Sequence, residues 1–213
     1  MVTRFSLLKE LSTILPDDVL VVASIANNSG FWAEIMERES NLFHLTMGMC
    51  TPTALGLALG LPQRKVVSLD ADGNLLLNLG VLGTAANQSP SNLTIIVLDN
   101  RNYLGSHKDE PGMPTATGGK MNLDGVARES GIASAHTIQD VKHFREKIEM
   151  ALSKPGPHFI CAKVEALDSD RPPRTKRVPD PRENKYRFAA YIERTEGVRI
   201  LGTSPESIDR AED

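Results

Sequence analysis

The segment KVVSLDADGNLLL, residues 65–77, decides the fold class because it joins a strand to a helix through an acidic turn. Residues 65–69 form an apolar run typical of a buried strand, and the leucine-rich residues 74–87 are predicted to form a helix. Between them, Asp72 and Gly73 lie at the carboxyl end of the strand. This strand–turn–helix order is the building unit of α/β proteins.

The same alternation of strands and helices continues along the chain. Strands are also predicted over residues 19–24, 42–46, 93–98, 132–137 and 158–164, and helices over 3–15, 31–39, 47–61, 122–130 and 138–153. Residues 27–30 (NNSG) and 101–121 are predicted to be loops. Because helices separate successive strands, the pattern predicts a doubly wound, three-layer α/β fold with a mainly parallel sheet of about six strands.

The composition indicates one ordinary α/β domain with an appendage. Residues 1–166 are predicted to form the domain, and the polar, basic and proline-rich residues 167–213 an extended arm with a short docking helix at 186–193. The net charge of −3 and the 5% aromatic content disfavour binding to nucleic acid or to a membrane surface. Since the start of the chain lacks the apolar run of a signal peptide, and no stretch is long enough to span a membrane, we expect a cytoplasmic protein. Cys50 and Cys161 are predicted to be buried core residues rather than a disulfide or a zinc site.

Polar residues end two of the predicted strands. Asp72 follows one, and Asn100 follows the strand at 93–98, 28 positions further on. Ligands of open parallel sheets bind beyond the carboxyl ends of the strands, and a helix that begins there favours an anion. Mg²⁺ is usually held by one or two carboxylates, neutral oxygens and phosphate groups. Asp72, the side-chain amide of Asn100 and the backbone carbonyl near Asn102 are therefore a candidate magnesium set, with Gly73 allowing close approach of the backbone to a ligand.

Three stretches carry a resemblance to a known family. DADGN at 70–74, followed by LDN at 98–100, resembles the cofactor motif of thiamine diphosphate (TPP)-dependent enzymes, with Ala71 and Asp99 as departures from its usual glycine and asparagine. HLTMGMCTPTALGLALGLP at 44–62 resembles the segment that precedes this motif in the family. PTATGGKMNLDGVARESG at 114–131 is similar to the loop and helix that follow the cofactor site in phosphonopyruvate and sulfopyruvate decarboxylases. The three stretches occur in the family's order and spacing.

The resemblance implies a role for each matching residue. Asp72, Asn100 and the Asn102 carbonyl would bind magnesium, and Met47 would hold the TPP rings in a bent arrangement. The cofactor contacts implied are Asn27, Asn28, Gly48, Met49, Asp72, Gly73, Asn74, Asn100, Asn102, Tyr103 and Leu104. Simpler alternatives stay open for several of these residues: Met47 as a core methionine, and Asn27 and Asn28 as caps of the next helix. His107, with Lys108 and Lys120, is a candidate for a catalytic or substrate-binding role, and the alternative is a solvated loop histidine.

The resemblance also implies a partner. Enzymes of this family use a second domain that binds the aminopyrimidine ring, and this chain has room for only the diphosphate-binding half. The expected protein is the β subunit of a hetero-oligomeric, TPP- and magnesium-dependent 2-oxo acid decarboxylase, completed by a separate α subunit. The alternatives are a carboligase or other carbon–carbon lyase subunit, and a non-catalytic TPP-binding regulatory domain. A Rossmann-type nucleotide site is disfavoured because no GxGxxG follows the first predicted strand.

Overall fold

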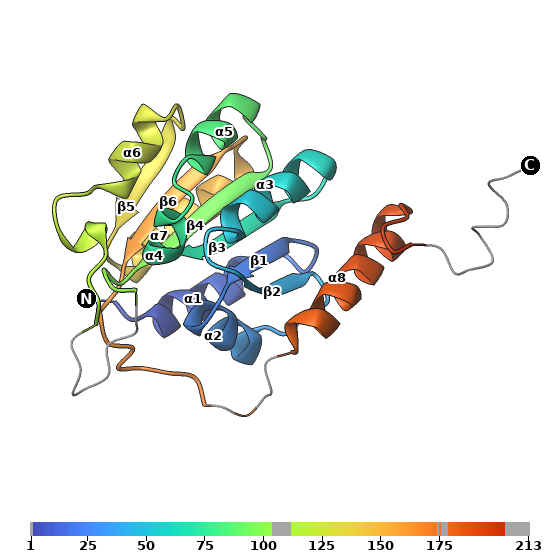
Figure 1. The fold of residues 1–213 in the computed structure, drawn as a ribbon, viewed down its shortest axis with the longest axis horizontal. Coiled ribbons are helices and arrows are strands. Elements are labelled where there is room, and N and C mark those ends of the chain that lie inside the picture. The colour runs from blue at the N-terminus through green and yellow to red at the C-terminus, as the bar shows by residue number, and fades with distance from the viewer. Residues whose placement is uncertain (1, 104–111, 174, 176–178, 203–213) are drawn as a thin grey trace, which may run out of the picture.

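A single six-stranded sheet organises the chain in the computed structural model, which describes residues 2–103, 112–173, 175 and 179–202. The strands run β2-β1-β3-β4-β6-β5 across the sheet, and every neighbouring pair is parallel (Figure 1). They are β1 (Leu20–Ser24), β2 (Asn41–Leu45), β3 (Val66–Ala71), β4 (Leu93–Asp99), β5 (Ser134–Ile138) and β6 (His158–Lys163). The predicted doubly wound parallel sheet is confirmed.

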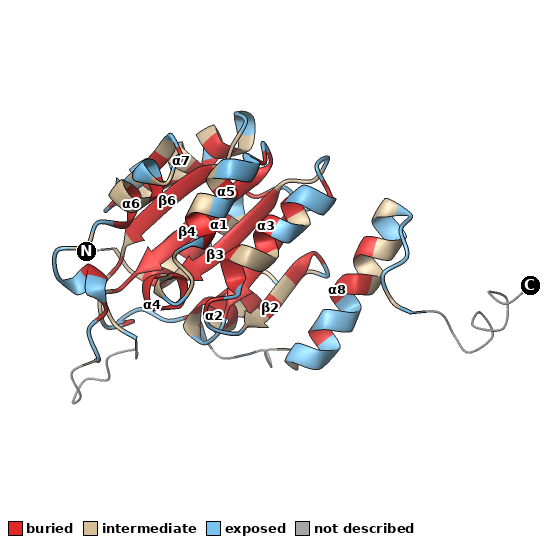
Figure 2. Cartoon of the chain, turned by 45° about the horizontal axis from the view of Figure 1, so that its top comes forward, coloured by how far each residue is buried: buried red, intermediate tan, exposed pale blue. Residues whose placement is uncertain are grey.

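Helices connect the strands and cover both faces of the sheet. They are α1 (Arg4–Ile14), α2 (Asn27–Ile35), α3 (Cys50–Gly60), α4 (Asp72–Leu76), α5 (Val81–Gln88), α6 (Leu123–Glu129), α7 (Val141–Ser153) and α8 (Pro181–Glu196), with a 3-10 turn at Ala116–Gly118. Helices α1, α2 and α7 form one apolar core with the sheet, and α3, α5 and α6 form another with its opposite face. The four inner strands β1, β3, β4 and β6 are therefore buried from both sides, as Figure 2 shows, whereas the edge strands β2 and β5 are partly accessible. Cys50 and Cys161 are buried free thiols in these layers, as predicted.

The prediction of a loop at residues 27–30 is wrong. These residues form the first turn of α2, directly after β1. The usual signal for a helix start is missing because the residue before the helix is Ala26, which makes no side-chain cap and has a φ of +69°. The three polar side chains that read as a loop instead reach out from the helix to other parts of the fold.

The single helix predicted over residues 74–87 is also wrong, since α4 and α5 are separate. Between them the chain makes turns closed by hydrogen bonds that span three residues, from Val81 N to Asn78 O and from Leu82 N to Leu79 O. Asparagine and glycine in this segment disfavour a continuous helix. The helix predicted from residue 47 begins later, at Cys50, because Gly48 adopts a φ of +80°. Residues 47–49 thus form a turn at the end of β2.

Helix α8 covers the edge strand β2 (Figure 1). It is longer than the docking helix predicted at 186–193, because Asp180 caps it and Pro181 opens it. Phe188 and Ile192 add to the core of the sheet. Among the described residues no helix is long and apolar enough to cross a membrane.

Candidate functional site

A cavity of about 260 Å³ opens at the carboxyl ends of β1, β3 and β4. Its wall contains eight residues predicted to contact the cofactor or to act on it, together with four others. The predicted ones are Asn27, Asn28, Met47, Gly73, Asn74, Asn100, Asn102 and Tyr103; the others are Arg4, Ile25, Ala26 and Ala71. Residues more than 70 positions apart in the sequence therefore meet at the edge where α/β proteins bind ligands.

Asp72 lies beside this cavity as the first residue of α4, and it is fully buried. Its Oδ2 accepts hydrogen bonds from the hydroxyls of Thr115 (2.7 Å) and Thr117 (3.2 Å). Burial raises the pKa of Asp72; the Thr115 hydroxyl opposes the rise, and the neighbouring Asp99 carboxylate adds to it. Because burial disfavours the charged form of Asp72, a cation placed beside it would stabilise that charged form strongly.

The second oxygen of Asp72 faces Asn100. One of the two terminal positions of the Asn100 side-chain amide, which either its oxygen or its nitrogen can occupy, lies 3.1 Å from Asp72 Oδ1 and 3.0 Å from the carbonyl oxygen of Asn102. With nitrogen in this position the amide donates to both oxygens, and no cation is needed; with the amide turned over, its oxygen would face two other acceptors and could share a cation with them. Adjacent ligands of an octahedral Mg²⁺, each bonded at about 2.1 Å, lie about 3.0 Å apart. A carboxylate, a side-chain amide that can turn its oxygen inwards and a backbone carbonyl are the ligand types that magnesium takes, so the residues present fit this metal.

This oxygen set differs from metal sites built on charged or imidazole ligands. Among the described residues no group of three or more His, Cys, Asp or Glu is arranged to hold a metal ion. Two of the three oxygens here are neutral, which suits a cation that also binds phosphate.

Asp99, one of the two departures from the family motif, is not part of the cavity wall. It is fully buried and forms an ion pair with Lys163 of β6. Its Oδ1 accepts from Thr117 Oγ1 at 2.8 Å and from Arg101 N at 3.0 Å. The negative charge of Asp99 is therefore balanced within the fold.

Glycine at position 73 is required by a close neighbour. A Cβ on Gly73 would lie 2.6 Å from Cδ1 of the Tyr103 ring, well inside van der Waals contact. Asn74 is buried and uses both ends of its amide within the protein: its Nδ2 donates to Asp70, and its Oδ1 accepts from Gly48 N at 3.2 Å. The Asn74 side chain thus fixes the turn that carries Met47.

Met47 is exposed, with 41% of its surface accessible, and it lines the cavity. The alternative of a core methionine is therefore wrong. Its turn is held from both sides of Gly48, because Asn78 Nδ2 donates to Gly48 O at 3.1 Å. Met49 is also exposed, but it lies outside the cavity wall.

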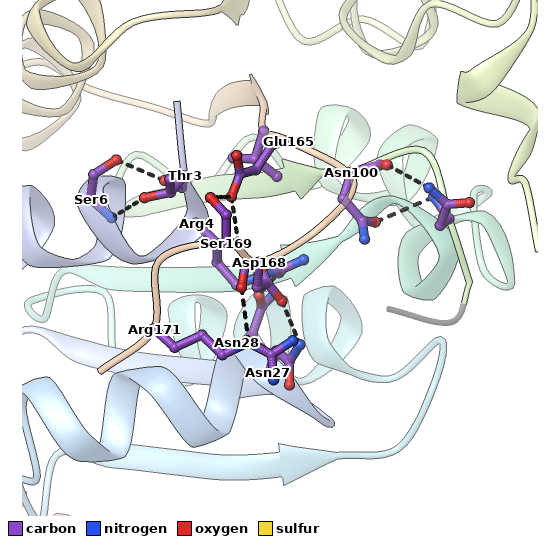
Figure 3. Close-up of polar contacts among 12 residues, drawn as sticks. Thr3, Arg4, Ser6, Asn27, Asn28, Asn100, Glu165, Asp168, Ser169 and Arg171 are labelled. Carbon is purple, nitrogen blue, oxygen red and sulfur yellow. Dashed lines mark hydrogen bonds and ion pairs between the residues drawn. The ribbon is translucent and has the colours of Figure 1, made fainter. Parts of the chain in front are cut away.

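Asn27 and Asn28 do not cap α2. Asn27 Nδ2 donates to Asp168 Oδ2 at 2.5 Å, and Asn28 Nδ2 donates to Asp70 O at 2.8 Å. The oxygen of the Asn28 amide accepts from the Arg4 guanidinium. Figure 3 shows Arg4, Asn27, Asn28 and Asp168 meeting at one point, with Asn100 to one side.

Four residues singled out from the sequence are not placed in the cavity wall. Leu104, His107 and Lys108 fall outside the described residues, and Lys120 is solvent-exposed.

Other residues of the site were not predicted from the sequence. Patterns missed Arg4 and Asp168, which come from the first helix and from the segment after β6. Thr115, Thr117 and Lys163 were also missed, although both threonines lie in the stretch PTATGG that carries part of the resemblance.

The cavity at the carboxyl edge and the oxygen cluster beside it define an α/β ligand-binding domain of the doubly wound class. The family model "Thiamine pyrophosphate enzyme, C-terminal TPP binding domain" matches residues 31–162. The chain belongs to this family.

Relatives of known name agree with this assignment. The chain is 34% identical to the sulfopyruvate decarboxylase subunit beta of Methanothermobacter thermautotrophicus, over 81% of this chain and 87% of that one. It is 30% identical to the phosphonopyruvate decarboxylase of Streptomyces viridochromogenes, over 89% of this chain and 46% of that one. The solved structure of benzoylformate decarboxylase from Polynucleobacter necessarius shares the fold with a TM-score of 0.65 and 18% identity, over 76% of this chain and 33% of that one. The chain thus spans most of the subunit-type relative, and about a third to a half of the longer ones.

Proposed function

We propose that this chain is the diphosphate-binding subunit of a TPP- and magnesium-dependent 2-oxo acid decarboxylase, completed by a separate subunit that binds the aminopyrimidine ring. The family and the named decarboxylase relatives support the TPP-dependent lyase activity. The observation that carries the magnesium part is that the Asn100 side-chain amide lies within 3.1 Å of both the Asp72 carboxylate and the Asn102 carbonyl, three groups that can each supply an oxygen ligand.

In this proposal Asp72 and Asn100 hold Mg²⁺ through their side chains, and Asn102 through its carbonyl. Thr115 keeps the Asp72 carboxylate in place by donating to the oxygen that the metal does not use. Gly73 leaves room for the Tyr103 ring, which closes one wall of the cavity. When bound, TPP supplies a nucleophilic carbon and an electron sink for the loss of carbon dioxide from a 2-oxo acid.

Met47 has the position expected of a residue that shapes the cofactor. It lines the cavity on a turn fixed by Asn74 and Asn78. An unbranched thioether is a suitable wedge between two rings. Its role in this chain is therefore to orient the cofactor rather than to transfer a proton.

Exposed apolar side chains around the cavity support the proposal that a partner subunit binds there. They are Ile25, Met47, Met49, Leu77 and Tyr103, with 38–58% of their surfaces accessible. Large apolar groups gathered at one edge mark an interaction surface. The relatives named subunit beta imply a separate alpha subunit, and we place it over this edge, where it would close the cavity.

The substrate class follows from the relatives' names. Sulfopyruvate and phosphonopyruvate are 2-oxo acids with a second anionic group, and a basic side chain at the cavity mouth would recognise that group. Lys120 is the exposed candidate in the described part of the loop, and His107 and Lys108 are candidates outside it. The same scaffold could support carboligation, since that choice depends on the pocket completed by the partner.

The test is to combine the chain with an alpha subunit of the sulfopyruvate decarboxylase type and to measure carbon dioxide release from sulfopyruvate, phosphonopyruvate and pyruvate. The proposal expects turnover that requires both chains, TPP and Mg²⁺, and that stops on addition of EDTA. Tight TPP binding without turnover on any 2-oxo acid would favour the non-catalytic regulatory alternative. Failure to bind TPP with Mg²⁺ would overturn the proposal.

A further inference from the structure

Arg4 is the only charged residue in the wall of the cavity, as far as the described residues show. It is 4% exposed, although arginine is among the residues least often buried. Two of its guanidinium nitrogens have partners: Nε donates to Asp168 Oδ1 at 3.1 Å, and Nη1 donates to the Asn28 amide oxygen. Within the described residues, no hydrogen-bond acceptor is found for Nη2.

Asp168 and Asn28 hold the guanidinium in one orientation. Asp168 is itself buried and also accepts from Asn27, so the segment after β6 is tied to the first turn of α2 (Figure 3). A rigid guanidinium with donors remaining is the preferred recognition group for phosphate oxygens. Asp168 balances the charge of Arg4, and the hydrogens of Nη2 are the donors that remain for an anion in the cavity.

Arg4 and Met47 approach the cavity from opposite faces of the sheet. Arg4 opens α1, which packs on the face covered by α2 and α7. The Met47 turn precedes α3, which packs on the other face. A ligand whose rings lie against Met47 and whose diphosphate reaches the Asp72 and Asn100 oxygens would extend its far end towards Arg4.

We infer that Arg4 binds the outer phosphate of the TPP diphosphate and makes this site select a diphosphate over a monophosphate, with Asp168 as its positioning residue. This inference rests on the proposed function, since it assumes that the cavity holds TPP. It adds a cation from the first helix, which lies outside the three stretches that carry the family resemblance.

The test is calorimetric titration of the full chain with TPP and with thiamine monophosphate, both in Mg²⁺. The variant Arg4→Gln/Asp168→Asn removes both charges together, so that no buried charge is left unpaired. The control is Arg64→Gln/Glu196→Gln, a somewhat more exposed ion pair at the amino end of β3, whose side chains are 10% and 8% accessible against 5% and 3% for Arg4 and Asp168. We expect the Kd for TPP to rise at least about tenfold in the Arg4 variant, and the Kd for the monophosphate to stay within about twofold. The control should bind both compounds like the wild type.

A second variant covers the case in which the double substitution unfolds. Arg4→Lys keeps the charge but cannot contact Asp168, Asn28 and a phosphate at once, so it should weaken TPP binding and leave monophosphate binding unchanged. An unchanged ratio of the two Kd values in a folded Arg4 variant would overturn the inference and leave the proposed function standing. Failure of the wild type to bind TPP with Mg²⁺ would overturn both.

Discussion

Lys163 on β6 donates from its ammonium group to the buried carboxylate of Asp99 at the end of β4. The pair lies directly behind the oxygen cluster, because Thr117 bonds to Asp99 at 2.8 Å and to Asp72 at 3.2 Å. Asp99 stands where the family motif has a neutral asparagine, so Lys163 supplies the charge that this replacement requires. The two positions are therefore expected to depend on each other.

Lys163→Met should lower the free energy of unfolding by about 3 kcal/mol, because it leaves the Asp99 carboxylate buried without its cation. Lys163→Met/Asp99→Asn should recover most of this loss, since an asparagine can still accept from Thr117 and Arg101. Urea denaturation of both variants and of Asp99→Asn completes a double-mutant cycle. Purely additive effects would contradict the dependence.

Asp72→Asn should stabilise the metal-free chain while abolishing its response to magnesium. The raised pKa of Asp72 shows that the folded chain disfavours its charge. Removing that charge should raise the melting temperature at neutral pH by about 2–4 °C, the shift that about 1 kcal/mol produces in a chain of this length. Thermal unfolding with and without Mg²⁺ and TPP checks both effects. A variant still stabilised by Mg²⁺ and TPP like the wild type would remove Asp72 from the site.

The pH dependence of these effects has a defined sign. In the unfolded chain Asp72 titrates near 3.8, and in the folded chain at a higher pH. The destabilisation caused by its charge is therefore absent below pH 3.8, grows as the pH rises from 3.8 to the raised pKa, and is complete above that pKa. The stability gain of Asp72→Asn should appear only in and above this window. Stabilisation of the wild type by Mg²⁺ and TPP should disappear as the pH falls through the same window, because the metal requires the carboxylate.

Much of this site could be predicted from the sequence because its residues directly follow strands. A polar residue that ends an apolar run must lie at the carboxyl edge of a parallel sheet, and Asp72 and Asn100 meet there. Gly73 could be predicted because it follows Asp72 at the strand end, and Met47 because it lies in one of the stretches that resemble the family. The parallel sheet and its two layers of helices agree with the fold predicted from the alternation of strands and helices.

The remaining site residues could not be predicted because nothing local in the sequence marks them. Arg4 opens an amphipathic helix, where an arginine usually lies in solvent, and only the tertiary fold buries it against Asp168, 164 positions away. The start of α2 was missed because Ala26 gives no capping signal. The partner of Asp99 could not be identified either, since Lys163 ends a strand distant in the sequence.

Met47→Ala should leave magnesium-dependent TPP binding unchanged and lower kcat of the assembled enzyme by about 10- to 100-fold. The proposed diphosphate contacts do not include Met47, whereas misplacing the reacting ring by about 1 Å would have a cost of this size. Ile200→Ala removes a similarly exposed apolar side chain beyond α8 and serves as the control. Binding by calorimetry and turnover on the same preparations separate the two effects. A variant with wild-type kcat would exclude Met47 as a wedge.

Asn184→Ala should destabilise the chain by about 2 kcal/mol through loss of two hydrogen bonds. Asn184 of α8 accepts from Phe43 N at 2.7 Å and donates to Asn41 O at 3.0 Å, so it satisfies the open edge of β2. An exposed edge strand promotes pairing with other chains, and we expect the variant to aggregate more readily. Tyr186→Ala, an exposed position on the same helix, should change stability by less than about 0.5 kcal/mol. Urea denaturation and light scattering test both effects, and equal behaviour of the two variants would exclude a role for Asn184 at the edge.

The most direct test of the metal site is a crystal structure of the chain with TPP and Mn²⁺ in place of Mg²⁺, with anomalous scattering recorded to locate the metal. Our account predicts one anomalous peak bonded to Asp72 Oδ1, Asn100 Oδ1 and Asn102 O, each at about 2.1–2.2 Å, and bridged to the diphosphate. A peak elsewhere, or TPP bound while the Asn100 amide nitrogen still donates to Asp72, would contradict it.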